Sequence, residues 1–292
     1  MPHEIMVTGT GTAVGNHIAK YLSNTKFNLI ATYNQNRPKN LNNCKLIKID
    51  LSKKIKKKIN FDYIIHCASK IPRDGQNLEN YRQNIIFMKN LLKLVNINKC
   101  KRIIFLSAVS LYGKPLVKKI DEKSLPLKPK NYGKSKLACE KEIIKFSKRS
   151  GLKYTILRLP AIIGHNIKNN FISNIFEKIK NDKIIEVYNI NQKFNNVIHI
   201  NILSEIIYKI IVREKKNSIY LLGSKYPIKI KTIIKMIKDK FPKKVKFNIL
   251  KNKKINFTLN IKSIIENKYR IISTKETIKK EILNLIKNKK NA

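Results

Sequence analysis

The stretch VTGTGTAVG, residues 7–15, joins a short apolar run to a segment with helical periodicity. A glycine-rich turn at such a junction lets the backbone N–H groups of a helix N-terminus face a pyrophosphate. Gly9 and Gly15 fit the frame G-x-x-G-x-x-G, but Thr12 occupies the middle position and Gly11 stands one place early. A single glycine-rich match is weak evidence, and a tight strand-to-helix turn is the alternative. The stretch predicts a dinucleotide site near the N-terminus.

The residues that follow this turn alternate between strand and helix patterns. Short apolar runs rich in β-branched residues succeed one another as EIMVTG, FNLIATY, CKLIKIDL, DYIIHCAS, KRIIFLSAV and YTILRLP. Helical patterns separate most of them, including a long one over residues 77–96. Strands this apolar, joined by crossover helices, are typical of a parallel sheet buried on both faces. We therefore predict an α/β fold with a doubly wound parallel sheet over residues 1–165.

The pattern becomes less regular after Gly164. Helices are expected near residues 171–181, 201–213 and 229–240, with short strands between them. No internal repeat or flexible linker is visible. Residues 166–292 are therefore predicted to form a smaller α/β lobe.

The composition limits the possible partners. The chain of 292 residues has 63 Lys and Arg against 18 Asp and Glu, a formal net charge of +45. Such a charge suggests nucleic acid or an anionic membrane. The Lys residues, however, run through nearly every segment and do not cluster with aromatic residues. We expect no specific nucleic acid and no membrane as partner, only a basic surface that attracts anionic nucleotides.

Neither a metal site nor a disulfide framework is expected. The four cysteines have no C-x-x-C spacing, and the five histidines have no H-x-x-x-H spacing. The N-terminal residues lack the apolar core of a signal peptide, and no segment reaches the ~18 apolar residues of a membrane span. A cytoplasmic protein with reduced thiols is the expectation.

The end of the second strand normally distinguishes the two nicotinamide cofactors. A carboxylate there accepts hydrogen bonds from the ribose of NAD, whereas a basic residue accommodates the 2′-phosphate of NADP. No Asp or Glu occurs between Glu4 and Asp50, while Asn34 and Arg37 lie in the segment YNQNRPKN. The sequence thus favours NADP over NAD. Asp50 is either an acceptor for the adenine amine or an ordinary turn residue at a strand end.

The stretch NYGKSKLACEK, residues 131–141, places Tyr132 and Lys136 four positions apart in a helical pattern. Residues at this spacing lie on one face of a helix, one turn apart. A fixed cation near a tyrosine favours its phenolate form, which makes the tyrosine usable as a general acid or base. A solvent-exposed helix that happens to carry Tyr and Lys is the alternative.

The order of several motifs points to a family resemblance that covers nearly the whole chain. After the glycine turn these motifs are IDL, IIHCAS, FLSAVSLYG, YGKSK and LRLPAIIG. The chain resembles the extended short-chain dehydrogenase/reductase family, in particular the NAD-dependent epimerase/dehydratase type that acts on nucleotide sugars. The resemblance implies a Rossmann-type domain, NAD or NADP as cofactor, a nucleoside-diphosphate sugar as substrate, and binding of this substrate by the smaller lobe of residues 166–292. It also implies a homodimer through the helix of Tyr132 and the long helix before it, and a segment near residues 194–213 that returns to the cofactor domain.

The same resemblance assigns roles to individual residues. Tyr132 would exchange a proton with a sugar hydroxyl during hydride transfer at C4, and Lys136 would favour the ionised tyrosine and hydrogen-bond the nicotinamide ribose. The other implied cofactor contacts are Gly9, Gly11, Thr12, Ala13, Val14, Gly15, Asn34, Arg37, Asp50, Leu51, Cys67, Ala68, Pro160 and Ala161. Implied substrate contacts are Ser107, Ala108, Asn166 and Asn195.

One departure from the family concerns the hydroxyl that hydrogen-bonds the substrate oxygen. The family carries Ser or Thr four residues before the tyrosine of its VYG-type motif, and Ala108 occupies that position here. Ser107 faces the other side of a regular strand, and Ser110 takes the catalytic role if the strand end twists or bulges. The 4,6-dehydratases carry an Asp-Glu pair where Val109 and Ser110 stand, which disfavours a dehydratase.

Three classes of function remain. The first is an NAD(P)-dependent epimerase or ketoreductase acting at C4 of a nucleoside-diphosphate sugar. The second is a non-catalytic NADP-binding sensor or scaffold, suggested by Ala108 and Thr12 but opposed by the presence of both Tyr132 and Lys136. A nucleic-acid-binding protein, suggested by charge alone, ranks last.

Overall fold

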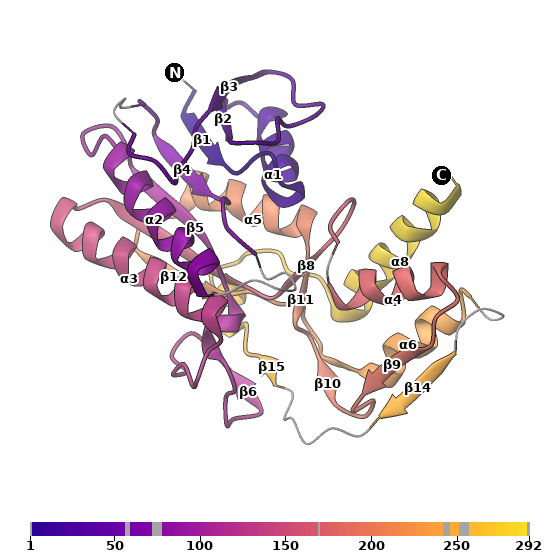
Figure 1. Ribbon diagram of the computed structural model, residues 1–292. Helices are drawn as coiled ribbons and strands as arrows, with labels where there is room; N and C mark the ends of the chain where they lie inside the picture. Colours follow the sequence, from indigo (N-terminus) through magenta and orange to yellow (C-terminus); the bar gives the residue numbers. More distant parts are fainter. Residues whose placement is uncertain are drawn as a thin grey trace. The chain divides into compact units, whose positions relative to one another are not determined.

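The protein is described by a computed structural model that covers residues 2–55, 59–71, 78–168, 170–241, 246–250 and 257–290. Its largest sheet has seven strands in the order β12-β7-β5-β4-β1-β2-β3 (Figure 1). These strands are β1 (Glu4–Thr8), β2 (Asn28–Tyr33), β3 (Cys44–Lys48), β4 (Tyr63–His66), β5 (Arg102–Ala108), β7 (Lys153–Leu159) and β12 (Ser218–Leu221). The pairs β1–β2, β1–β4, β2–β3 and β4–β5 are parallel.

Helices lie on both faces of this sheet. They are α1 (Ala13–Ser23), α2 (Leu78–Leu94), α3 (Asn131–Ser150) and α5 (Ile200–Arg213). α2 and α3 pack side by side (Figure 1), and Phe27, just after α1, contacts Tyr208 of α5 with ring centroids 5.6 Å apart. The connection from β1 through α1 to β2 leads toward the β3 edge of the sheet, whereas the connection from β4 through α2 to β5 leads toward the β12 edge. Since such crossovers are right-handed, α1 and α2 cover opposite faces.

The central strands β1, β4 and β5 are largely apolar runs because both of their faces are buried, whereas the edge strand β3 has no buried residue. Met6 of β1, Ile64 of β4 and Ile103 of β5 are fully buried in one cluster with Met88 and Leu91 of α2. The connections that leave β1 and β4 lead in opposite directions along the sheet. The carboxyl ends of these two adjacent strands are therefore the switch point of the sheet. Ligands of doubly wound folds bind at this place.

The chain divides into two compact units. Unit 1 comprises Met1–Lys114, Leu125–Arg158 and Ser204–Tyr220, and unit 2 comprises Pro115–Ser124, Leu159–Leu203 and Leu221–Ala292. The part of α5 from Ser204 onward therefore belongs to unit 1. Our sequence interpretation had placed the first boundary between residues 165 and 166, a few residues beyond Arg158. The predicted helix over residues 77–96 corresponds to α2, and Asn77 lies outside the described residues.

The described residues of unit 2 form small two-stranded sheets and helices, and the start of α5 also belongs to this unit. β8 (Ala161–Ile163) pairs with β11 (Val197–His199), β9 (Ile185–Tyr188) with β14 (Phe247–Leu250), β10 (Lys193–Phe194) with β13 (Ile228–Lys229), and β6 (Lys119–Ile120) with β15 (Thr258–Leu259). The helices are α4 (Phe171–Lys180), α6 (Ile230–Lys238), α7 (Lys262–Glu266) and α8 (Thr274–Lys290). A core made largely of isoleucine from α4, α6, α8, β9 and β11 holds them together. No helix in the described part of the chain is long and apolar enough to span a bilayer.

Candidate active site

The turn between β1 and α1 brings backbone segments together with no side chain between them. The Thr12 hydroxyl caps α1, because it donates to the Gly9 carbonyl at 2.8 Å and accepts from the Gly15 N–H at 3.2 Å. A Cβ on Gly15 would lie 2.3 Å from the Gly9 carbonyl oxygen. A Cβ on Gly11 would lie 2.1 Å from the Asn36 carbonyl oxygen. No larger residue fits at either position without displacing backbone.

This helix start fits an anionic group. The first N–H groups of a helix have no carbonyl partner within it, and its dipole is positive there. Ala13 is exposed and Val14 half-buried, and the first turn of α1 contains no acidic residue. The arrangement fits the pyrophosphate of a dinucleotide. The Thr12 hydroxyl, which we expected to reach the phosphate, is instead used to close the turn.

The carboxyl ends of β1 and β4 meet beside the turn. A Cβ on Gly9, whose φ is +73°, would lie 2.7 Å from the Ala68 backbone. The Thr8 hydroxyl accepts from the Ala68 N–H at 3.4 Å and lies 2.8 Å from Nδ1 of His66. Burial raises the pKa of the Cys67 thiol to about 12, so this side chain is a neutral lining group. The structure thus brings Cys67 and Ala68 against the glycine turn.

The segment after β2 carries the residues expected to select the cofactor. Asn34 and Arg37 are both exposed, and they flank Asn36, whose carbonyl touches Gly11. The segment therefore lies beside the glycine turn, as a ribose-binding segment must.

The segment after β3 places Asp50 in a turn. Oδ1 of Asp50 accepts from the hydroxyl of Ser52 at 2.6 Å and from its N–H at 2.9 Å, and these hydrogen bonds lower the pKa of the carboxyl group. Leu51 is buried, and its carbonyl accepts from the Asn90 side chain of α2 at 2.9 Å. Asp50 is thus an ionised turn residue, which leaves the adenine contact a prediction.

Tyr132 and Lys136 lie in the first turns of α3. Gly133 lets α3 approach the short 3-10 helix η1 (Val109–Tyr112), because a Cβ there would lie 2.2 Å from the Ser110 carbonyl oxygen. The Lys136 side chain is only 4% exposed, and its Nζ donates to the Leu106 carbonyl of β5 at 2.8 Å. The ammonium lies 5.7 Å from the centroid of the Tyr132 ring. A buried cation is therefore fixed beside a half-buried tyrosine at the carboxyl end of β5.

The Lys136 ammonium also affects the pKa of His66. Burial, with a smaller contribution from Lys136, lowers the pKa of His66 to about 3. The neutral imidazole is stacked 5.8 Å from Phe105, and the Lys136 ammonium lies 4.8 Å from that ring. The ammonium is thus held by a carbonyl and an aromatic ring.

The serines near Ala108 have different surroundings. β5 ends at Ala108 and the chain continues as η1, so the alternation of a regular strand does not apply to Ser110, which is exposed. Ser107 is buried and its hydroxyl donates to Oε1 of Glu140 at 2.5 Å. Ser107 therefore lies beneath the site, and Ser110 is the exposed hydroxyl of this turn.

Sequence reasoning missed a buried polar network under the site. The Arg158 guanidinium donates to Glu140 at 2.8 Å and to the Tyr112 hydroxyl at 2.8 Å, while Glu140 also accepts from Ser107. These groups connect β5, η1, α3 and β7. The available signal was the spacing of Glu140, which stands four residues after Lys136 and so lies on the same face of α3.

A second missed residue is Asn84 of α2. Its amide donates to the Ser135 hydroxyl at 3.1 Å and to the Lys70 carbonyl at 3.1 Å, and its oxygen accepts from the Lys70 N–H at 2.7 Å. It therefore ties the loop after β4 to α3. A single Asn on the apolar face formed by Tyr81, Met88 and Leu91 was the signal in the sequence.

The site residues expected in unit 2 are dispersed. Pro160 is buried and Ala161 is half-buried in β8. Asn166 is exposed and has a φ of +61°. Asn195 is buried, and its side chain bonds the backbone of Ser224 and Leu259, which joins three segments instead of presenting the amide to a ligand.

Comparisons with known proteins agree with this geometry. Residues 5–223 match the model of the NAD dependent epimerase/dehydratase family. The chain is 24% identical over 245 residues to a UDP-glucose 4-epimerase of Vibrio cholerae, covering 78% of this chain and 73% of that protein. It is 30% identical over 173 residues to a UDP-glucose 4-epimerase of Lactobacillus helveticus, covering 55% and 52%.

Solved structures show the same fold. A UDP-glucuronic acid 4-epimerase from Bacillus cereus, in complex with NAD, superposes with a TM-score of 0.81 at 20% identity over 97% of this chain and 99% of that one. A UDP-glucose 4-epimerase superposes with a TM-score of 0.84 at 18% identity over 99% of both chains. The predicted Rossmann-type fold is thereby confirmed. Because the family match spans most of the sequence, the chain belongs to the NAD dependent epimerase/dehydratase family.

Proposed function

We propose that the protein interconverts the C4 epimers of a UDP-linked sugar with a resident NAD. The observation that carries this proposal is the buried Lys136, whose ammonium is fixed by the Leu106 carbonyl 5.7 Å from the Tyr132 ring. A buried cation paired with a tyrosine at the carboxyl end of a sheet strand suits proton transfer. The epimerase names of the relatives support the substrate class.

The glycine turn would hold the pyrophosphate of the dinucleotide through the first N–H groups of α1. Asn34 and Arg37 would meet the adenosine ribose, with Asp50 and Leu51 near the adenine. Bound at this site, the nicotinamide would accept and return the hydride of the sugar C4. The close approach of Gly9 to Ala68, which leaves the edge of the turn free of side chains, supports this fit.

The residues of the chain move the proton. The Tyr132 phenolate oxygen would take the proton of the sugar C4 hydroxyl as the hydride leaves C4 and would return the proton when the hydride comes back. The Lys136 charge would favour the phenolate while the proton is on the sugar. The Ser110 hydroxyl, in place of the absent hydroxyl at Ala108, would hydrogen-bond the same sugar oxygen. Val109 and Ser110 offer no acid or base for eliminating water, so a dehydratase is disfavoured.

A 4-ketoreductase that consumes NADPH is the second candidate. The exposed Asn34 and Arg37, with no acidic residue after β2, favour it because Arg37 could pair with a 2′-phosphate. The complexes of the solved relatives name NAD and do not support the preference for NADP that the sequence suggested. A non-catalytic sensor of the same fold would have no use for a buried Lys136.

The nucleotide that co-purifies with the protein separates these candidates. The wild-type protein is denatured and the released nucleotide is identified by mass, and NAD and NADPH are then titrated by thermal shift. Retained NAD supports the epimerase, and freely exchanging NADPH supports the ketoreductase. Stabilisation by neither contradicts both.

Two glycine variants control this experiment. Gly11→Val places side-chain atoms where the Asn36 carbonyl lies and should abolish nucleotide retention. Gly151→Asn, at the end of α3, has no atom within 4 Å of its Cβ and a φ of +72° that Asn tolerates, so it should retain the nucleotide.

A further inference from the structure

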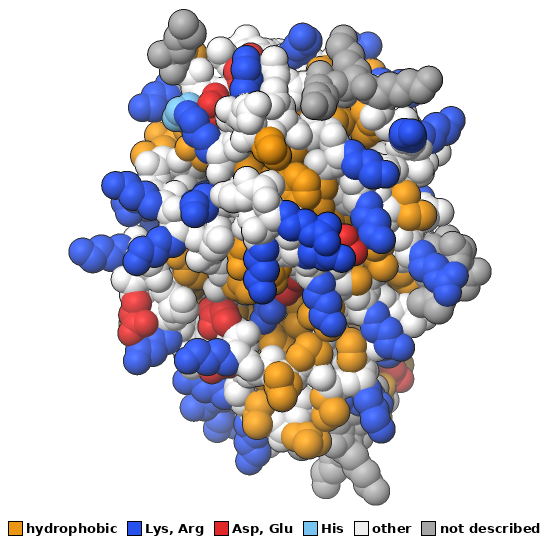
Figure 2. Space-filling model, turned by 90° about the vertical axis from the view of Figure 1, so that its left-hand side faces the viewer, with side chains coloured by type: hydrophobic (Ala, Val, Ile, Leu, Met, Phe, Trp, Pro, Cys, Tyr) orange, Lys and Arg blue, Asp and Glu red, His pale blue; other side chains and the backbone are white. Residues whose placement is uncertain are grey.

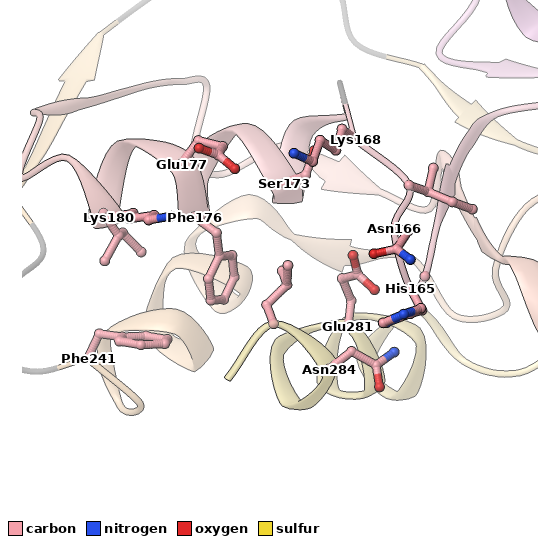
Figure 3. Close-up of a pocket in the computed structure, with 14 residues that line it drawn as sticks. His165, Asn166, Lys168, Ser173, Phe176, Glu177, Lys180, Phe241, Glu281 and Asn284 are labelled. Atoms are coloured by element: carbon pink, nitrogen blue, oxygen red, sulfur yellow. The ribbon is translucent and has the colours of Figure 1, made fainter. Parts of the chain in front are cut away.

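Unit 2 contains a cavity of about 470 Å³ that Tyr132 and Lys136 do not line (Figure 3). Its walls come from residues 164–168 after β8, from α4, from Phe241 after α6 and from α8. The volume falls in the range of small-molecule pockets, ~300–1,000 Å³. Of the expected substrate contacts only Asn166 borders it, at the end of the cavity where His165 lies.

A buried carboxyl group faces this cavity. Glu281 of α8 is only 1% exposed, and its side chain rises from the helix toward Asn166 (Figure 3). The Gly164 N–H and the Asn284 amide hydrogen-bond the carboxyl group, but Oε2 has no hydrogen-bond partner among the described residues. Burial raises the pKa of Glu281 despite these two donors. A desolvated carboxylate with an unfilled acceptor is costly unless a donor occupies the remaining position.

Two phenylalanine rings mark the other end of the cavity. Phe176 of α4 and Phe241 lie edge to face with ring centroids 5.3 Å apart. Figure 3 shows both rings on one side of the cavity, where Glu177 and Lys180 also lie, and the Glu281 carboxyl group on the other. Ile179 and Leu285 are further apolar residues of the lining. The cavity therefore has aromatic rings at one end and a buried carboxyl group at the other.

The donors that act on the pKa of Glu281 are neutral groups. Lys168, Glu177 and Lys180 line the cavity but are exposed to solvent, as is His165. The groups that hold the carboxyl are the neutral N–H of Gly164 and amide of Asn284. A cationic donor supplied by a ligand would give the strongest hydrogen bond available to the remaining oxygen.

We propose that this cavity binds a small primary amine with a ring-sized apolar body, its ammonium on Oε2 of Glu281 and its body between Phe176, Phe241 and Leu285. The site is separate from the proposed hydride chemistry and does not rest on it. Its contacts with the end of β8 and with α4 make it a candidate regulatory site of unit 2.

The test uses three probes on the full chain, measured by titration calorimetry and by ligand-observed NMR. 2-Phenylethylamine has the amine and the ring, 3-phenylpropionate has the ring with an acidic head, and ethylamine has the amine without the ring. We expect saturable binding of 2-phenylethylamine at least tenfold tighter than that of either control. Equal or tighter binding of 3-phenylpropionate, or no saturable binding of 2-phenylethylamine, overturns the proposal.

Three variants locate the binding. Glu281→Gln keeps the shape but removes the charge and should weaken the binding of 2-phenylethylamine at least tenfold. Glu186→Gln removes an exposed carboxylate of β9 that does not line the cavity and should leave binding unchanged. Leu285→Phe adds volume inside the cavity, keeps Glu281 and should also abolish binding. This variant tests the location of the site if Glu281→Gln does not fold. Unchanged binding in folded Glu281→Gln or Leu285→Phe contradicts the assignment.

Discussion

In the proposed mechanism, Ser110 replaces the hydroxyl that is absent at Ala108 as the donor to the substrate oxygen. Ala108 is the last residue of β5 and has no donor, whereas Ser110 is exposed in η1. Ser110→Ala should therefore lower kcat roughly tenfold or more with little change in KM, since the hydroxyl acts on the developing charge. Ala108→Ser should raise kcat in the Ser110→Ala background. Steady-state kinetics on both variants check this, and an unchanged kcat in Ser110→Ala would rule the hydroxyl out.

His66 predicts a specific acid sensitivity. Its pKa of about 3 in the folded protein lies below the ordinary value of 6.5, so between these values the unfolded chain binds one proton more than the folded one. Stability is fully present above pH 6.5, and the free energy of unfolding falls by about 1.4 kcal/mol per pH unit as the pH drops toward 3. His66→Gln should show a shallower decline in urea unfolding below pH 6.5. Parallel curves for the two proteins would contradict this origin.

Some residue roles could be predicted from the sequence and others could not. The proximity of Tyr132 and Lys136 could be predicted because helix geometry fixes their separation. The glycines of the first turn could be predicted because no side chain fits at those positions. The predicted ligand contacts of Ser107 and Asn195 stay predictions, and the sequence did not show that their polar atoms also bond Glu140, Ser224 and Leu259, which are distant along the chain. No local pattern reveals those partners.

The elements around the site are joined by the Glu140–Arg158 pair. The two groups are nearly buried, and Arg158 also donates to Tyr112 of η1. Removing one partner leaves a buried charge, so Arg158→Met and Glu140→Met should each lower the free energy of unfolding by about 3–5 kcal/mol. The double variant should lose far less than the sum. Urea unfolding of all four proteins measures the coupling, and additive losses would show that the pair does not act as a unit.

The strands were predictable because buried parallel strands are continuous apolar runs. The end of β5 was not, because the run KRIIFLSAV continues into Val109, where the chain already turns into η1. That turn depends on the close contact of Gly133 with the Ser110 carbonyl, which is a tertiary approach and leaves no mark in the local pattern.

At the scale of the whole molecule, the strongly basic composition raises the question of polyanion binding. Lys and Arg side chains are scattered over the face shown in Figure 2 among apolar and neutral groups, and no single basic stripe forms there. At a net charge of +45, contacts with polyanions should be non-specific and lost with moderate salt. Measurements on the purified protein are therefore best made at high ionic strength.

The family resemblance predicts a homodimer through α2 and α3. Ile86 of α2 is 41% exposed on the helix pair, and a second copy would cover it. Light scattering should give twice the chain mass of 34.0 kDa. Ile86→Asp should reduce the mass to one chain, while Leu125→Asp, in an exposed loop, should leave the dimer intact. A wild-type protein that is monomeric at micromolar concentration would contradict the prediction.

The most direct test of the account is epimerisation in D₂O. The NAD-loaded protein is incubated with UDP-glucose, UDP-galactose or UDP-glucuronic acid, and the sugar is followed by NMR. The account predicts conversion of at least one of them to its C4 epimer with the original hydrogen retained at C4, and a rate at least a hundredfold lower in Tyr132→Phe. No interconversion by the loaded wild-type protein, deuterium at C4, or an unimpaired Tyr132→Phe would contradict it.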